Sequence, residues 1–194
     1  MMTGGSGIDA AAFDRFAVVL FGSPPVIAAV ETIRQSLPPS GRPILPGHVT
    51  VKGTFIKPHD LVRTVETLRA ACAEFPPIAL TADQCRTCVD GPYVGAWLTV
   101  EPSDVLSALH WRLVEQLADH GETIYPGEST GDFRPHLTIV QEVPAEHEAS
   151  ILATINAAEH RFTWTASEVA LVGRRGGLAW ETLATFPLGA QAQR

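Results

Sequence analysis

The sequence predicts an α+β fold made of two similar halves that together form one bilobal domain. Short β-branched segments alternate with amphipathic segments, which is typical of strands packed against helices. Turn signals separate pairs of neighbouring strands, so antiparallel hairpins are expected. A His-x-Thr-x motif occurs once in each half, at His48 and at His136, which are 136 − 48 = 88 residues apart. We therefore expect a pseudo-two-fold duplication in which each lobe is an antiparallel sheet with outer helices and the two motifs face a central groove.

The first half is predicted to contain a strand, a helix, a motif strand, a second helix and a hairpin. Its helices begin at Pro residues and repeat apolar residues every three or four positions. Its hairpin turns through Asp90-Gly91-Pro92, a turn signal. The expected elements are a strand at 15–21, a helix from Pro24, capped by Ser23, to about Ser36, a motif strand at 47–55, a helix from Pro58 to about Phe75, and strands at 78–89 and 93–100.

The second half repeats this order and borrows strand 93–100 as its opening strand. The distance from His48 to Glu101 is 53 residues and that from His136 to Leu188 is 52, and such equal spacing is typical of a duplication. A long loop precedes the second motif, and either a lid over the site or a plain surface connection fits it. The expected elements are a helix at 104–120 capped by Ser103, the loop Gly121–Arg134, a motif strand at 135–143, a helix at 144–158, and strands at 162–172 and 178–187.

Both motifs lie on short β-branched segments, Gly47–Val51 and Pro135–Ile139, and are therefore expected on strands. Because side chains alternate between the two faces of a strand, the His and the Thr of each motif share one face, and apolar residues occupy the other. Two such pairs facing each other would place two acid/base groups and two hydroxyl groups around one small anion. A His followed two residues later by Ser or Thr occurs about once by chance in such a chain. The two matches are therefore significant because both have apolar neighbours and both occupy the same place in the internal repeat.

The charge of the chain limits its partners. The formal net charge is −7 over 194 residues. An extended nucleic-acid footprint would need a basic stripe, so none is expected. A small phosphodiester or an RNA end remains compatible, because a few local cations can hold one or two phosphates. We expect the protein to act as a monomer.

Neither end of the chain predicts a secretory or membrane segment. Residues 1–12 are rich in Gly and lack Lys and Arg, so they are interpreted as a tail, as are residues 190–194, around one domain at 13–189. No apolar run approaches the roughly 18 residues that span a bilayer, so a cytoplasmic protein is expected. Cys85 and Cys88 form a CxxC on a predicted strand without the second pair that a zinc site would need, so they are interpreted as unligated thiols.

The pair of motifs resembles the 2H phosphoesterase superfamily, which includes the bacterial 2′-5′ RNA ligase/RNA 2′,3′-cyclic phosphodiesterase family. The resemblance is carried by two His-x-Thr-x motifs, one per lobe, about ninety residues apart, and it covers roughly Arg15 to Leu188. It implies metal-independent hydrolysis of 2′,3′-cyclic phosphates of RNA ends or nucleotides, usually to a 2′-phosphate, without a cofactor. It leaves open whether the chain also catalyses 2′-5′ RNA ligation, the reverse reaction.

The resemblance also implies a role for each motif residue. His48 takes the place of the general acid that protonates the leaving 3′-oxygen, and His136 takes the place of the general base that activates water. Thr50 and Thr138 take the places that hydrogen-bond the phosphate oxygens. One position departs from the family: RNA-type members often carry an arginine shortly after the second motif, where this chain has Val140-Gln141.

The chemistry favours the same residues without the resemblance. In-line attack on a cyclic phosphodiester needs a base beside the water and an acid beside the leaving oxygen, and the unperturbed pKa of His suits both. A cation would stabilise charge on the non-bridging oxygens. Lys52 shares the face of His48 if the alternation along the strand is unbroken, and Arg134 shares that of His136 if the strand already begins there. The aromatic residues Tyr93, Trp97, Phe133 and Trp180 could stack a base, although core packing is the more general explanation.

Other functions stay open at this point. The same chemistry could act on a nucleotide-sugar cyclic phosphate or trim RNA 3′ tails. A nucleotide- or RNA-binding module without turnover is a different class, but binding alone needs no acid/base pair. A metalloenzyme with both histidines as ligands would want nearby carboxylates, and the nearest to either motif is Asp132, four residues before His136.

Overall fold

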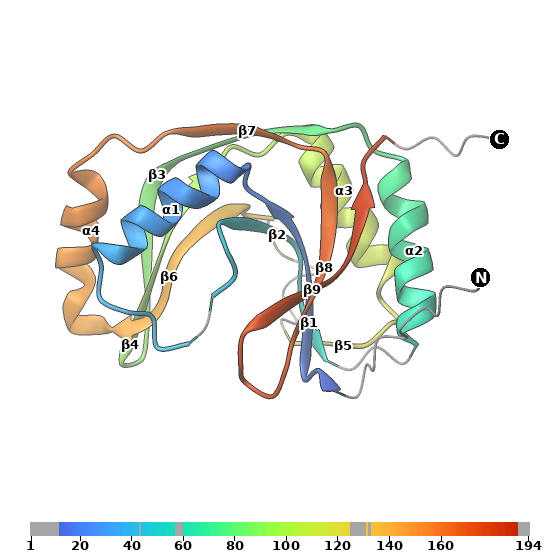
Figure 1. The fold of residues 1–194 in the computed structure, drawn as a ribbon, viewed down its shortest axis with the longest axis horizontal. Coiled ribbons are helices and arrows are strands. Elements are labelled where there is room, and N and C mark those ends of the chain that lie inside the picture. Colours follow the sequence, from blue (N-terminus) through green and yellow to red (C-terminus); the bar gives the residue numbers. More distant parts are fainter. Residues whose placement is uncertain (1–11, 43, 57–59, 125–130, 132, 190–194) are drawn as a thin grey trace, which may run out of the picture.

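The computed structural model describes residues 12–42, 44–56, 60–124, 131 and 133–189, and the expected tails lie almost entirely outside them. In this part the strands form one sheet in the order β7-β3-β4-β6-β2-β1-β8-β9, with β5 paired to β2 (Figure 1). All pairings are antiparallel. The strands are β1 (Arg15–Phe21), β2 (His48–Ile56), β3 (Ile78–Asp90), β4 (Tyr93–Val100), β5 (Glu122–Thr123), β6 (His136–Pro144), β7 (Phe162–Ala166), β8 (Glu168–Arg174) and β9 (Trp180–Pro187).

The two motif strands lie side by side in the middle of the sheet. β2 and β6 are joined through one residue pair, Val49 with Leu137. Longer ladders join β2 to β1 and β6 to β4. The sheet therefore has two halves, β7-β3-β4-β6 and β2-β1-β8-β9, that meet at the motifs. We expected a separate sheet in each lobe, and the direct pairing of β2 with β6 instead merges the strands into one sheet.

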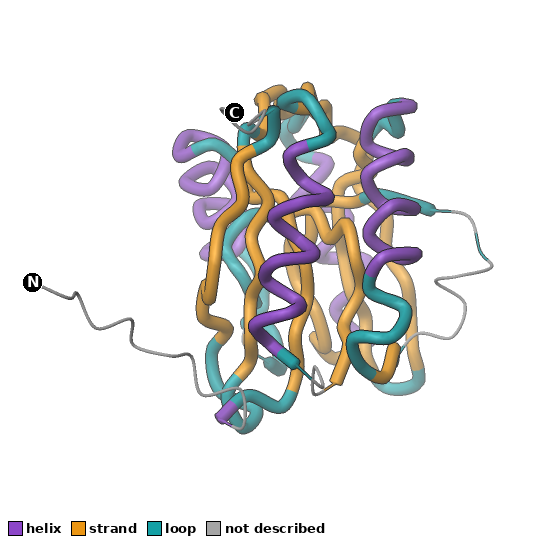
Figure 2. Tube along the Cα trace, turned by 90° about the vertical axis from the view of Figure 1, so that its right-hand side faces the viewer, coloured by secondary structure: helices purple, strands orange, loops and turns teal. Residues whose placement is uncertain are grey.

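Two helices cover each half of the sheet. α1 (Pro24–Gln35) and α4 (Glu148–Asn156) pack on the half that contains β3, β4 and β6, and α2 (Leu61–Ala73) and α3 (Asp104–Gln116) pack on the other. Figure 2 shows the second pair from its own side, with helices running along the strands. Among the described residues, no helix has both the length and the apolar character needed to cross a membrane.

The main apolar core lies between the sheet and the helices and extends through both halves. Val49 of β2 and Leu137 of β6 are fully buried in it, together with the apolar stripe of α3. A second, smaller cluster covers the opposite face of β1 and β8 around Ala17 and Val172, with Trp180 at its edge. One face of each motif strand thus packs into the core, as predicted from its alternating pattern, and the other face is left for polar side chains.

Both motif strands contain a β-bulge directly after the motif. The residue without a partner on β1 is Val51 in β2, and the residue without a partner on β4 is Ile139 in β6. Each lies three residues after the motif histidine. An extra residue in one strand interrupts the alternation of side chains. The residue four positions after each histidine, Lys52 in β2 and Val140 in β6, therefore turns to the core side of the sheet, where both are 2% exposed.

Most elements lie within a few residues of their predicted bounds, and the differences have local causes. The predicted strand at 162–172 is divided at Ser167, because β7 pairs with β3 whereas β8 pairs with β1. The predicted helix at 144–158 begins as a 3₁₀ turn, Ala145–His147, before α4. Ser103 caps α3 by accepting a hydrogen bond from the Leu106 N–H at 3.2 Å.

Three helix ends differ from the sequence prediction. Ser23 precedes α1, but its side chain makes no cap hydrogen bond. The predicted start of the second helix at Pro58 lies outside the described residues, and α2 is capped by Asp60, whose carboxylate accepts from the Arg63 N–H. α3 ends at Gln116, earlier than the predicted end near His120. The predicted loop at 121–134, the candidate lid, contains the short strand β5, and its residues 125–130 and 132 lie outside the described residues.

Candidate active site

The pairing of β2 with β6 brings the two motifs together. Because Val49 lies opposite Leu137 in an antiparallel pair, the register sets His48 across from Thr138 and Thr50 across from His136. The four polar side chains all point away from the core, since their neighbours Val49 and Leu137 point into it. They therefore form a square in which the two histidines occupy diagonal corners, and diagonal neighbours in such a pair are about 7–8 Å apart.

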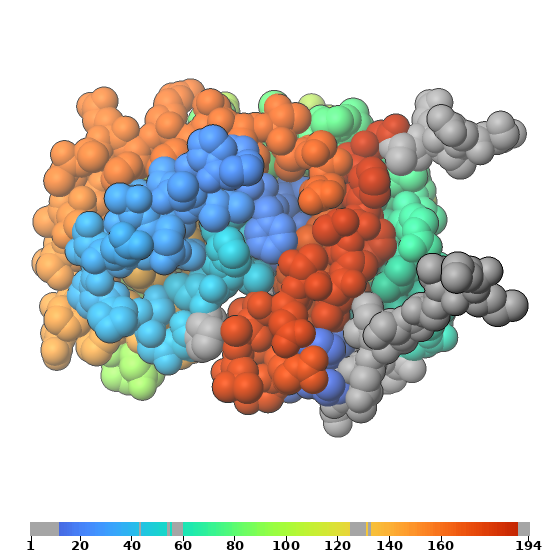
Figure 3. All heavy atoms as spheres, in the orientation of Figure 1, coloured from blue at the N-terminus to red at the C-terminus, as the bar shows by residue number. Residues whose placement is uncertain are grey.

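These four side chains line one pocket with a volume of about 200 Å³. The space-filling view shows the molecule hollowed between the segment around residues 40–50, in light blue, and the β8–β9 hairpin, in red (Figure 3). Three arginines also line the pocket, and no Asp or Glu does so among the described residues. The full set of described lining residues is Arg15, Ala17, Arg42, Ile44, Leu45, His48, Thr50, His136, Thr138, Gln141, Arg174 and Trp180. In a chain with a net charge of −7, this pocket is locally cationic.

His48 is buried at the inner wall of the pocket. Its Nδ1 donates a hydrogen bond to the backbone oxygen of Pro46 at 2.9 Å, and the residue is 6% exposed. Burial lowers the pKa of His48 from 6.5 to about 4, and the charges of Arg34 and His136 act in the same direction, while the bond to Pro46 opposes them. The imidazole is therefore neutral at pH 7, with the proton on Nδ1 and a lone pair on Nε2.

His136 lies in a more open environment. Its Nδ1 donates to the backbone oxygen of Arg134 at 3.0 Å, which matches the bond that His48 makes to a residue two positions earlier. Its ring lies 5.4 Å from that of Trp97, centroid to centroid. In both histidines the backbone holds Nδ1, so Nε2 is the nitrogen left for chemistry.

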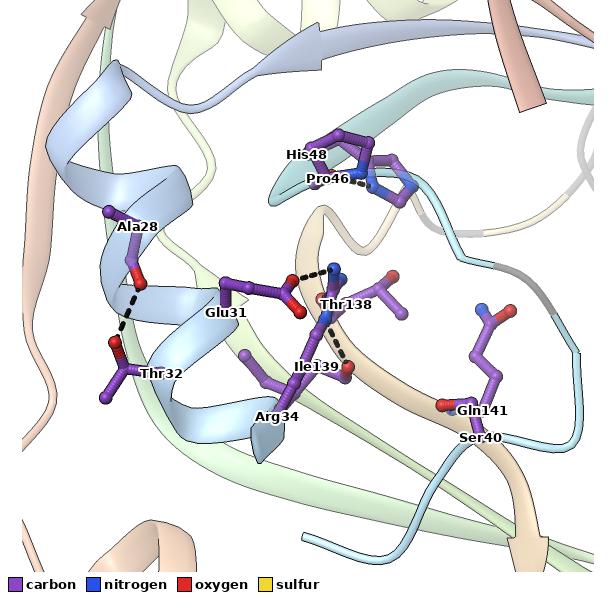
Figure 4. A network of polar contacts seen from close by, with 10 residues as sticks. All are labelled: Ala28, Glu31, Thr32, Arg34, Ser40, Pro46, His48, Thr138, Ile139 and Gln141. Carbon is purple, nitrogen blue, oxygen red and sulfur yellow. Dashed lines mark hydrogen bonds and ion pairs between the residues drawn. The ribbon is translucent and has the colours of Figure 1, made fainter. Parts of the chain in front are cut away.

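Arg34 of α1 donates hydrogen bonds to the backbone of the second motif (Figure 4). Its Nη2 donates to the backbone oxygen of Thr138 at 2.9 Å and its Nε donates to that of Ile139 at 2.8 Å. Glu31 lies 3.4 Å from the same guanidinium. The carbonyl groups at the bulge of β6 are thereby hydrogen-bonded, and the position of Thr138 is coupled to α1.

Arg42 enters the pocket from the loop between α1 and β2 and is held beside the second motif strand. Its Nε donates to Oε1 of Gln141 at 3.0 Å, and its Nη1 lies 3.0 Å from Oε1 of Glu142. The Gln141 N–H in turn donates to Oγ of Ser40 at 3.2 Å. Gln141 follows the second motif, and its hydrogen bond holds the guanidinium of Arg42 in the same pocket.

Lys52 is not among the residues that line the pocket. The prediction that it shares the face of His48 required an unbroken strand, and the bulge at Val51 turns it to the core side. Its Nζ lies 5.7 Å from the centroid of the Phe55 ring and 3.5 Å from Oγ1 of Thr123 in β5. This position gives Lys52 a packing role behind the site.

Arg134 lies beside the pocket rather than in it. β6 begins at His136, so the strand does not carry Arg134 onto the motif face. Together with Trp97 and Phe133 it lines a neighbouring cavity of about 530 Å³ that His136 borders as well. Of the other aromatic candidates, Trp180 lines the first pocket and Tyr93 is exposed at the β3–β4 turn.

The described residues contain no group of three or more His, Cys, Asp or Glu side chains that could hold a metal ion. Cys85 and Cys88 lie on β3, as predicted, and not at the start of a helix. All three cysteines are free thiols, and burial raises the pKa of Cys72 to about 12. The donor set of the pocket is thus imidazole, hydroxyl and guanidinium, which suits an anion.

The sequence did not identify Arg15, Arg42 or Arg174 as site residues. Arg15 and Arg174 are brought into the pocket by the pairing of β1 with β8, and these strands are separated by most of the chain. No local pattern marks such a pair. Arg42 lies in the loop before β2, and its place in the pocket depends on its contacts with Gln141 and Glu142 of β6.

The fold and the sequence both have relatives. The structure of TT0787 from Thermus thermophilus superposes with a TM-score of 0.65 at 15% identity, covering 91% of this chain and 99% of that one. That of Escherichia coli LigT complexed with 3′-AMP has a TM-score of 0.59 at 18% identity, with 93% and 99% covered. Two Geobacillus proteins named "putative phosphoesterase" are similar in sequence: one from G. kaustophilus at 26% identity, with 75% of this chain and 80% of that protein covered, and one from G. thermodenitrificans at 24%, with 90% and 96% covered.

The structural neighbours share the α+β architecture with its antiparallel sheet and four helices, and at these identities they establish the fold alone. A family model decides membership, because it matches residues 22–178 and so spans both motifs. On that match, the chain belongs to the 2′-5′ RNA ligase superfamily.

Proposed function

We propose that the protein is a phosphoesterase that hydrolyses 2′,3′-cyclic phosphates of nucleotides or RNA ends to 2′-phosphates, with His48 and His136 as the acid/base pair. The observation that carries the proposal is the diagonal placement of two imidazoles around a pocket with three arginines and no described carboxylate. Relatives of the chain are named as phosphoesterases, and LigT has been crystallised with 3′-AMP, with NADP⁺ and with ATP. These names support a nucleotide-like phosphodiester as substrate.

The proposed reaction is an in-line displacement at phosphorus. A phosphate bound between the two strands has one histidine on each side, and Thr50 and Thr138 at the other corners donate to its non-bridging oxygens. One Nε2 takes a proton from water as the oxygen attacks phosphorus, and the other Nε2 gives a proton to the 3′-oxygen as its bond to phosphorus breaks. The guanidinium of Arg42 stabilises the charge that builds up on the phosphoryl oxygens. The product is a 2′-phosphate and a free 3′-hydroxyl, and the two histidines have exchanged protonation states.

The roles implied by the family resemblance make one demand on His48. As the acid that protonates the 3′-oxygen, it must carry a proton on Nε2 before the bond breaks. In the free protein burial keeps the pKa of His48 at about 4, so this proton is absent at pH 7. A bound phosphate anion raises the pKa of a neighbouring imidazole. We therefore propose that the negative charge of the bound substrate raises the pKa of His48, so that His48 takes up a proton from solvent and acts as the acid, with His136 as the base.

An internal duplication with two lobes fits this arrangement. β3 and the pair β7–β8 are offset by 162 − 78 = 84 and 174 − 90 = 84 residues, close to the 88 residues between the histidines. The first parts of these segments pair with each other symmetrically around Leu80 and Trp164. The matching bulges after the two motifs support the same relation. We also propose that the protein is a monomer and acts in the cytoplasm.

The cavity beside His136 offers a place for the base of the substrate. It is lined by Trp97, Phe133 and Arg134, and aromatic faces bind unpaired bases by stacking. In this arrangement Arg134 contacts the base instead of the reacting phosphate.

The test is an assay with 2′,3′-cyclic AMP and a 2′,3′-cyclic-phosphate-ended oligonucleotide in excess EDTA. The wild type is expected to open the ring to a 2′-phosphate, and His48→Ala and His136→Ala are each expected to lose about 10²-fold or more in kcat. His147→Ala, a change of an exposed histidine outside the pocket, serves as the control. A folded wild type that opens neither substrate would overturn the proposal and favour a binding module.

A further inference from the structure

We propose that the pocket holds a second phosphate of the same substrate, bound by Arg15 and Arg174 at the end of the pocket away from β6. This inference rests on the proposed function, since it concerns what else the substrate carries. It identifies the substrate class as a nucleotide with a phosphate in addition to the cyclic one.

The two arginines lie directly opposite each other on neighbouring strands. Arg15 of β1 is the cross-strand partner of Arg174 of β8, and Arg174 is in turn the partner of Trp180 of β9. The three residues form one row across three strands, and all three line the pocket. Like charges directly opposite each other in a sheet are destabilising. A ligand that carries negative charge would remove this repulsion.

Only one of the two guanidiniums has a carboxylate partner among the described residues. Arg174 donates to the Asp14 carboxylate through Nη2 at 2.6 Å and through Nε at 3.3 Å, and these hydrogen bonds lower the pKa of Asp14. Its guanidinium also lies 5.9 Å from the Trp180 ring, and its side chain is only 14% exposed. Arg15 makes no hydrogen bond or ion pair through its side chain with any residue in the described part of the chain. The row therefore has an arginine whose charge is offset in part by Asp14 beside one that has no carboxylate partner among the described residues.

The reacting phosphate is too far away to be the ligand of this row. Thr50 pairs with Val19 of β1, and Arg15 lies four residues further along that strand. At 3.3 Å per residue this is roughly 13 Å along the strand, plus about 4.8 Å for the step between strands. A phosphate held between Thr50 and Thr138 lies beyond the reach of the Arg15 side chain. Small side chains in between, such as Ala17, leave the pocket continuous from one end to the other.

The chemistry of the row selects phosphate. Guanidinium groups bind phosphate oxygens through paired hydrogen bonds, and a dianion can engage both arginines at once. Two phosphates on one ribose, the cyclic one and one at the 5′ position, are separated by a sugar, which the pocket between the motifs and the row can accommodate. The substrate would then span the pocket from His136 to Arg15.

Binding and turnover of matched ligands test this inference. Calorimetry compares adenosine 3′-phosphate with adenosine 3′,5′-bisphosphate, and kinetics compare 2′,3′-cyclic AMP with its 5′-phosphorylated form. The wild type is expected to bind and turn over the doubly phosphorylated member of each pair about tenfold or more better. This factor corresponds to the free energy of one hydrogen bond to a charged group. Arg15→Gln is expected to reduce this preference at least fivefold, and Arg175→Gln, which changes an exposed arginine outside the pocket, is expected to preserve it.

The possible outcomes separate the inference from the proposed function. Tighter binding of the bisphosphate, without hydrolysis of either cyclic compound, would support the second phosphate site and overturn the proposed reaction. Hydrolysis without preference, or an equal loss for both ligands in Arg15→Gln, would overturn the subsite and leave the reaction standing. Because Arg15→Gln also removes the repulsion across the strands, its unfolding temperature is expected to equal or exceed that of the wild type. A clear decrease would indicate a structural role for Arg15 and contradict the inference.

Discussion

The two motif strands have nearly the same local design and very different surroundings. Both carry His-x-Thr, both histidines donate Nδ1–H to the backbone oxygen two residues earlier, and both strands bulge three residues after the histidine. Yet His48 is 6% exposed with a pKa of about 4, whereas His136 lies beside Trp97 in a more open position. A repeated motif thus supplies two imidazoles with the same backbone hydrogen bond, and the burial of His48 lowers its pKa.

The strands also differ in the residues after the bulge. The fourth position after the histidine is Lys52 in β2 and Val140 in β6, and both are buried. The fifth is Gly53 in β2 and Gln141 in β6, and Gln141 holds Arg42 in the pocket. The two strands are therefore alike at the His and Thr of the motif and unlike at the residues that follow the bulge. Variants on both strands test whether this difference matters for activity.

The largest effect is expected from the two histidines together. His48→Ala and His136→Ala should each lower kcat by about 10²–10⁴-fold, and the double variant should be little worse than the weaker single variant, because the two groups act in one step. Steady-state kinetics on 2′,3′-cyclic AMP measure this. If the losses of the two single variants multiply in the double variant, or if one histidine costs less than tenfold, the two histidines do not act as a pair in one step.

The burial of His48 should appear as a pH dependence of stability. Its folded pKa is below the unfolded value of 6.5, so the unfolded chain binds more protons at low pH. The contribution is fully present above pH 6.5 and is lost as the pH falls toward 4, by up to about 3 kcal/mol. Urea unfolding of the wild type and of His48→Gln from pH 7 to pH 4 measures it. Equal losses in both proteins would show that His48 is not buried as described.

Arg42 should matter more than the residue that holds it. Arg42→Gln removes a charged contact to the phosphoryl group and should lower kcat/KM by about ten- to a hundredfold. Gln141→Ala leaves the guanidinium in place but less fixed, so a loss of only a few fold is expected. Arg161→Gln, which alters an exposed arginine paired with Asp83, is the control. If Gln141→Ala were the more damaging change, the amide and not the guanidinium would contact the substrate.

The smallest effect is expected from Lys52. Because the bulge turns it to the core side of the sheet, Lys52→Met should change kcat/KM by less than about threefold in a protein that remains folded. Kinetics at pH 7 with a circular dichroism check suffice. A loss comparable with that of Arg42→Gln would return Lys52 to the phosphate site.

The alternation and periodicity of the sequence predicted most of the fold and the four motif residues. Strand β1 has the predicted bounds, and the motif residues share a pocket as the repeat suggested. The errors arose where the pairing of strands far apart in the chain determines the position of a side chain. The bulge that moves Lys52 depends on the ladder with β1, and the row of Arg15 and Arg174 depends on strands far apart in the chain. The division of the strand at Ser167 likewise reflects two different partners and no local signal.

The most direct test of the account is a nuclear magnetic resonance titration of the histidine ring protons with and without adenosine 2′-phosphate, the proposed product. We predict that His48 titrates near pH 4 in the free protein and that the bound phosphate raises its pKa by at least about one unit. Both His48 and His136 should respond, and the distant His147 should not. A His48 resonance that is unchanged by saturating ligand would contradict the claim that the two motif histidines flank one phosphate.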